Sequence, residues 1–70
     1  MNYNLMPERT DDAVRVRVTD DTGRTIVTHV VALDDADNWK AETIQSLDQM
    51  DTLRGLDPES RTHTVLRDLA

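Results

Sequence analysis

The sequence predicts one small α+β domain, in which an antiparallel β-hairpin or three-stranded sheet packs against one amphipathic helix and a short C-terminal helix follows. Three observations predict this class. The chain has only 70 residues, two β-branched runs flank a turn signal, and a longer run then repeats apolar residues at three- and four-residue steps. Seventy residues supply one hydrophobic core, so residues 1–70 are expected to form a single domain.

The hairpin is expected from residues 13–33. Three valines alternate with two arginines over residues 13–19, which is the period of a half-buried strand. Residues 20–23 read Asp-Asp-Thr-Gly, which is turn chemistry, and a second β-branched strand is expected over residues 24–33. The alternation of residues 2–6 also permits a short edge strand that ends before Pro7.

The turn predicts the register of this hairpin. If Gly23 takes the left-handed position of a three-residue loop with a G1 bulge, Asp20 faces Arg24. The opposed pairs on the predicted core face are then Val18 with Ile26, Val16 with Thr28 and Val14 with Val30. The second face is predicted to carry Arg15, Arg17, Val27, His29 and Val31.

Two helices are expected after the hairpin. Short oxygen-bearing side chains over residues 34–38 can cap free N–H groups, so the first helix is expected over residues 35–53. Its apolar stripe consists of Ala36, Trp39, Thr43, Ile44, Leu47 and Met50. Gly55 is the expected stop, and Asp57 and Pro58 are the expected start of a second helix over residues 58–69. Residues 61–67 are also compatible with a strand, although helix is preferred.

Composition argues against several classes of function. The net charge of −6 disfavours direct binding to nucleic acid, whose affinity comes largely from Lys and Arg. A helix-turn-helix regulator or antitoxin that uses Arg61 and Arg67 is a lesser alternative. No secretory signal and no apolar run of about 20 residues is visible, so a cytoplasmic protein without membrane contact is expected, in the host cell if the genome is viral.

No catalytic, cofactor or metal site is expected. Ser46 and Ser60 lie in no triad or elbow motif, and His29 and His63 have ordinary positions within apolar runs. The aspartates of residues 34–37 do not fit a calcium loop, since the required glycine and glutamate are missing. Two distant glycines form no phosphate loop, and without cysteine there is no disulfide or thiolate zinc site. The chain is therefore expected not to be an enzyme.

Two surfaces are candidates for partner binding. The first is the second hairpin face, where Val27 and Val31 lie among arginines and His29, a composition typical of interfaces. The second is acidic and consists of Asp20, Asp21, Asp34, Asp35 and Asp37. If these acids line one edge, they could imitate a phosphate backbone. The alternatives are that the valine face packs under another element and that the aspartates serve turns and caps.

The expected function is that of a small acidic protein-binding or inhibitory module. Its partner would present a basic surface, such as that of a nucleic-acid-handling protein. Small acidic inhibitors from phages and mobile elements, anti-CRISPR proteins among them, are a class analogy for this behaviour. A homodimer formed through Val27 and Val31, serving as a structural or accessory subunit, is the alternative. Charge reversal of Asp20 and Asp21, or of Asp34 and Asp35, is expected to weaken partner binding.

Overall fold

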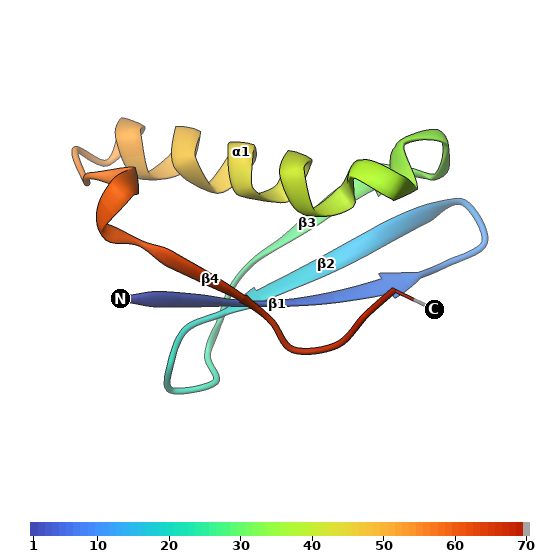
Figure 1. The fold of residues 1–70 in the computed structure, drawn as a ribbon, viewed down its shortest axis with the longest axis horizontal. Coiled ribbons are helices and arrows are strands. Elements are labelled where there is room, and N and C mark those ends of the chain that lie inside the picture. The colour runs from blue at the N-terminus through green and yellow to red at the C-terminus, as the bar shows by residue number, and fades with distance from the viewer. Residues whose placement is uncertain (70) are drawn as a thin grey trace.

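A four-stranded mixed sheet with one helix across it forms the fold (Figure 1). The computed structural model describes residues 1–69. The elements in chain order are β1 (Asn2–Arg9), β2 (Ala13–Thr19), β3 (Thr25–Ala32), the 3-10 helix η1 (Leu33–Asn38), α1 (Trp39–Leu53), the 3-10 turn η2 (Pro58–Ser60) and β4 (Thr62–Val65). The strand order is β3-β2-β1-β4, and β4 runs parallel to β1 while the other neighbours are antiparallel. The α+β class is confirmed.

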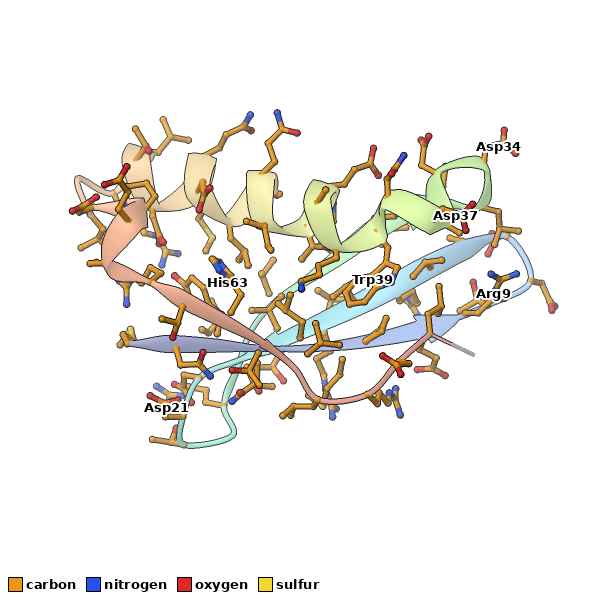
Figure 2. The ribbon with its side chains drawn as sticks, viewed as in Figure 1. Arg9, Asp21, Asp34, Asp37, Trp39 and His63 are labelled. Carbon is orange, nitrogen blue, oxygen red and sulfur yellow. The ribbon has the colours of Figure 1, made fainter. Side chains whose placement is uncertain are left out.

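The core lies between the sheet and α1. Its buried apolar residues are Tyr3, Leu5, Val14, Val16, Val18, Val31, Ala36 and Leu47. The valines of β2 all face this side because side chains of a strand alternate with period two. The predicted helix stripe is confirmed, since Thr43 and Leu47 are buried and Trp39 points from the helix toward the sheet (Figure 2).

The start of the helical segment differs in detail from the prediction. The chain first forms the six-residue 3-10 helix η1 from Leu33 and then continues directly into α1, which ends at Leu53 as expected. No side chain caps either helix, because neither Ala32 nor Asn38 makes a side-chain cap hydrogen bond. The capping role predicted for the side chains of residues 34–38 is therefore wrong for both η1 and α1.

Strand β1 is an inner strand and not the short edge strand that the proline suggested. The carbonyl oxygen of Pro7 accepts a hydrogen bond from Nε of Arg67 at 3.2 Å, so the backbone of Pro7 points away from β2. The pairing of β1 with β4 ends at Leu5 and Val65, before Pro7 is reached. The missing N–H of the proline therefore costs no ladder hydrogen bond, and β1 continues to Arg9.

The β2–β3 hairpin has the predicted loop. The amide of Asp20 donates to the carbonyl of Arg24 at 3.0 Å, and Gly23 has a φ of 86°. Thr19 lies opposite Thr25, as this loop requires. The prediction for the turn is therefore confirmed.

The predicted register beyond the loop is wrong, because a β-bulge at Ile26 adds one residue to β3. The observed pairs are Val18 with Val27, Val16 with His29 and Val14 with Val31. A shift of one residue exchanges the two faces of a strand. Val27, His29 and Val31 therefore face the helix side, and Thr28 and Val30 share the outer face with Arg17 and Arg15.

The predicted C-terminal helix over residues 58–69 is also wrong. Asp57 does act as an N-cap, since its Oδ1 accepts from the amide of Glu59 at 3.0 Å, but the turn η2 ends after three residues. The chain then pairs with β1, which places His63 beside Tyr3 and Val65 beside Leu5. Backbone pairing with the otherwise open side of β1 satisfies this segment better than an isolated short helix does.

Candidate binding groove beside strand β3

Strand β3 forms one free edge of the sheet. It has eight residues with the sequence TIVTHVVA, which contains no charged residue and no proline. Natural sheets protect their edges with lysine, proline, bulges or short strands, because a free edge is a template for another strand. The bulge at Ile26 protects only the start of β3, so the segment from Val27 to Ala32 is available for pairing.

The hydrogen-bonding pattern shows which backbone groups of β3 are free. The carbonyl of Leu5 accepts from the amide of Leu66 at 3.0 Å, so Leu5 bonds toward β4. Its antiparallel partner Val18 must then bond toward β3, and the other valines of β2 follow at two-residue steps. Their partners on β3 therefore point inward. Thr28 and Val30 lie between them and direct their N–H and C=O groups to the free edge. Ala32 directs its N–H to the same edge, whereas its C=O accepts the first hydrogen bond of η1 as the N-cap residue.

An open groove of about 460 Å³ runs beside this edge, between β3 and α1. The residues that line it are His29, Val30, Val31, Ala32, Asp35, Glu42, Gln45, Ser46 and Gln49. Asp35 and Glu42 are its acidic members, and no Lys or Arg is among the lining residues. The groove thus brings His29 and Val31 of the predicted valine face together with Asp35 of the predicted acidic surface.

The other residues of the predicted valine face lie elsewhere. Arg15 and Arg17 are exposed on the sheet face opposite the helix, so they do not share a surface with Val27 and Val31. Val31 is only 2% exposed, and Val27 is half-buried against the core. The alternative that these valines pack under another element is therefore the one that the fold shows, and that element is α1.

The predicted acidic residues gather at two opposite ends of the molecule. Asp21 lies in the β2–β3 turn, whereas Asp34 and Asp37 lie in η1 at the far end (Figure 2). Asp20 has a structural role, since its Oδ1 accepts from the hydroxyl and amide of Thr22 and from the amide of Arg24. These hydrogen bonds, that of the Thr22 hydroxyl first, hold the pKa of Asp20 below its usual value. The acids therefore do not line one edge.

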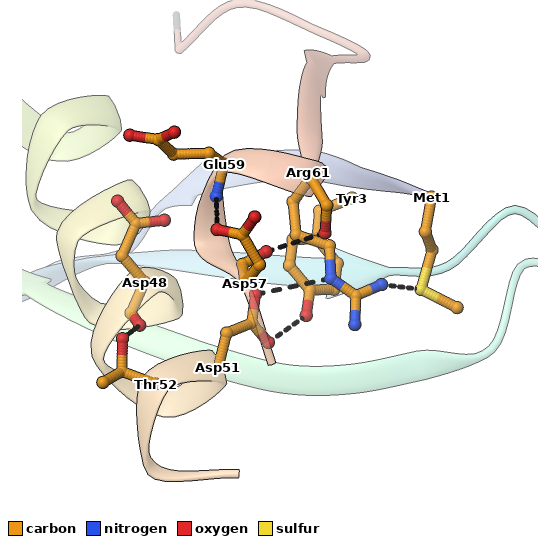
Figure 3. Close-up of polar contacts among 9 residues, drawn as sticks. Met1, Tyr3, Asp48, Asp51, Thr52, Asp57, Glu59 and Arg61 are labelled. Atoms are coloured by element: carbon orange, nitrogen blue, oxygen red, sulfur yellow. Dashed lines mark hydrogen bonds and ion pairs between the residues drawn. The ribbon is translucent and has the colours of Figure 1, made fainter. Parts of the chain in front are cut away.

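A buried polar cluster joins α1 to β1 and β4 near the other end of the helix (Figure 3). The hydroxyl of Tyr3 donates to Oδ1 of Asp51 at 2.7 Å, and Nε of Arg61 lies 3.5 Å from Oδ2 of Asp51. The Arg61 guanidinium lies 5.4 Å from the centroid of the Tyr3 ring, and His63 packs beside that ring at 5.8 Å. Asp51 has no solvent exposure, so the cluster is a structural anchor and is closed to a substrate-sized molecule.

Sequence reasoning missed this cluster, although one signal was available. Thr43 and Leu47 belong to the buried stripe, and Asp51 follows Leu47 by four residues. A carboxylate on the buried side of a helix needs a partner, because an unpaired buried charge is expensive. The partners lie on β1 and β4, however, and nothing local in the sequence names them.

The anchor predicts a loss of stability in alkaline solution. Burial, followed by the hydrogen bond to Asp51, raises the pKa of Tyr3 above its ordinary value of 10.0. The contribution of this group to stability is therefore complete below that ordinary value and is lost as pH rises through the raised pKa. Tyr3 is the only tyrosine, so a phenolate absorbance titration of the native protein reports it alone. We expect a midpoint above 10.0 and a weaker alkaline loss of stability in Tyr3→Phe. A midpoint at the ordinary value would contradict the anchor.

No protein-family model, curated protein or solved structure matches this chain significantly. Within residues 1–69, no three His, Cys, Asp or Glu side chains gather closely enough to hold a metal ion. No helix in this part of the chain is long and apolar enough to cross a membrane.

Proposed function

We propose that the protein is a non-enzymatic protein-binding module that adds an extended segment of a basic partner to the edge of β3. One observation carries the proposal: an uncharged edge strand with free backbone groups lies directly beside a groove whose charged residues are acidic. Strand addition to a sheet edge is a common mode of peptide recognition. A nucleic-acid-handling protein has basic segments of this kind, and occupying one of them would inhibit its binding to nucleic acid.

The alternation of side chains along a strand suggests which partner sequences would be preferred. Backbone bonds to Thr28, to Val30 and to the N–H of Ala32 would give affinity without regard to sequence. Every second side chain of the partner would lie over the groove, near Asp35 and Glu42, and would favour Lys or Arg. The side chains between them would lie beside Val30, which is 56% exposed, and would favour apolar residues.

The test uses a fluorescent peptide of about ten residues with alternating Arg and Val, compared with one of alternating Glu and Val. We expect the basic peptide to bind more tightly in an anisotropy titration. Val30→Pro should weaken it by about tenfold, since the substitution removes an edge-facing N–H that makes no bond to β2. Asp35→Lys combined with Glu42→Lys should weaken it at least as much.

The matched control is Asp21→Lys combined with Glu59→Lys, which makes the same charge change at exposed residues outside the groove. This control should keep most of the affinity, and circular dichroism should show all variants folded. Equal binding of the basic and acidic peptides, or an unchanged affinity in Val30→Pro, would contradict the proposal.

A second copy of this chain is the alternative occupant of the same edge. Antiparallel pairing of two β3 strands would bring the end that follows Arg24 beside the end that precedes Asp34 and Asp35. This charge complementarity favours a symmetric dimer through the edge of β3. The edge thus replaces Val27 and Val31 as the proposed dimer contact. Sedimentation should then show a dimer that Val30→Pro converts to monomer. A monomeric wild type would exclude it.

A further inference from the structure

The sheet face opposite α1 has a concavity of about 350 Å³ that the groove does not reach. It is lined by Met6, Glu8, Arg15, Arg17, Thr28 and Arg67. Three guanidinium groups therefore surround it with one carboxylate, in a chain whose net charge is −6. The net charge of the molecule is negative, but the surface around this concavity is positively charged.

No ion pair neutralises these arginines within residues 1–69, and one of them is anchored to the backbone. Nε of Arg67 donates to the carbonyl of Pro7, which anchors that side chain beside β1 and leaves its terminal nitrogens free to bind. Arg15 and Arg17 point to the same face, about 7 Å apart along β2. Glu8 lies opposite Arg15 in the register, yet none of the three arginines forms an ion pair within residues 1–69.

The arrangement suits a phosphate group. The guanidinium presents a planar fork of N–H donors that matches phosphate oxygens in pairs. Charges separated by less than about 10 Å are incompletely screened at ordinary salt, so three arginines around one concavity repel one another. A multivalent anion would remove this repulsion.

We propose that this concavity binds a compact small molecule that carries more than one phosphate group. A nucleic-acid strand fits the face less well. Single strands are held largely by bases stacked on aromatic rings, whereas Tyr3 is buried and Trp39 packs against the core on the helix side. The chain has no phenylalanine, and its net charge of −6 repels a long polyanion.

The probe for the test is inorganic pyrophosphate, added at constant ionic strength and followed by thermal unfolding and calorimetry. We expect saturable binding and a rise in Tm, since a ligand that binds only the folded state stabilises it. Arg15→Gln combined with Arg17→Gln should remove the rise, and Arg67→Gln should reduce affinity by about tenfold. Arg24→Gln is the matched control, because Arg24 is an exposed arginine of the β2–β3 turn outside the concavity.

Two outcomes would overturn this proposal. A rise in Tm that is equal in wild type and in the double variant would mean general screening of charge. A stronger response to an oligothymidylate of about ten nucleotides than to pyrophosphate would mean a nucleic-acid surface. The experiment contains no peptide and concerns the face away from α1, so it can succeed or fail independently of the proposed function.

Discussion

Asp51→Ala is expected to lower the free energy of unfolding by about 3 kcal/mol, the lower end of the cost of breaking a buried ion pair. The substitution leaves the phenol of Tyr3 without its acceptor and the guanidinium of Arg61 without its carboxylate. The lower end applies because the Arg61 side chain keeps 11% of its exposure and water can solvate part of it. A domain of this size rarely has more than about 3–5 kcal/mol in total, so much of the variant should be unfolded.

Urea denaturation followed by the fluorescence of Trp39, the only tryptophan, measures this effect. Asp48→Ala is the matched control, since it removes a carboxylate from the same helix three residues earlier, where the side chain is half-buried and makes no ion pair within residues 1–69. Asp51→Asn keeps an acceptor for Tyr3 and should lose less stability than Asp51→Ala. Equal losses in Asp48→Ala and Asp51→Ala would mean that the cluster is not an anchor.

Local patterns predicted the parts of the fold that depend on local physics. The alternation in β2, the apolar stripe of a helix that ends at Leu53 and the left-handed Gly23 all follow from the geometry of neighbouring residues. Each of these features constrains the chain over a few residues. They were therefore readable without knowing the rest of the molecule.

The β-bulge at Ile26 is the feature that the sequence-based prediction of the hairpin register missed. Turn chemistry fixes the pairing up to Thr19 and Thr25, but an extra residue in one strand leaves no sign in a run that is β-branched on both faces. The error changed the candidate site, because it put Val31 on the surface and Val30 in the core. In the fold the exposed and buried valines are reversed, since Val31 is buried and Val30 is exposed.

Contacts between distant parts of the chain account for the other errors. The partner of β4 is β1, some 60 residues earlier, as in the hydrogen bond from Thr62 to Asn2. Tyr3 and Asp51 are separated by 48 residues. Propensities alone make residues 61–67 nearly equally suited to a helix and to a strand. The strand forms because the open side of β1 offers backbone groups for pairing. Strand order and the buried anchor therefore could not be predicted from short stretches of sequence.

The separation of charge between the two sides of the sheet is also a consequence of the fold. The groove beside α1 has acidic charges, whereas the opposite concavity has three arginines. A net charge of −6 predicts one kind of partner, but a surface with two signs in two places accommodates two. The proposed peptide groove and the proposed phosphate site can therefore coexist on one small domain.

Leu47→Ala is expected to lower the free energy of unfolding by about 2–5 kcal/mol, the usual cost of a cavity at a buried leucine. Leu47 is only 2% exposed and belongs to the same buried core as the valines of β2. The same helix provides its own control, because Leu53 is 89% exposed and Leu53→Ala should change stability by less than about 0.5 kcal/mol. Both substitutions make the same chemical change in the same helix.

Urea midpoints of the two variants, compared at equal slope, separate burial from helix propensity, since alanine is at least as good a helix former as leucine. A large loss in Leu47→Ala alone would show that α1 covers the sheet with the face that contains Leu47. Equal effects in the two variants would contradict that orientation. The groove beside β3 would then lose its second wall, which Glu42, Gln45, Ser46 and Gln49 of α1 form in this orientation.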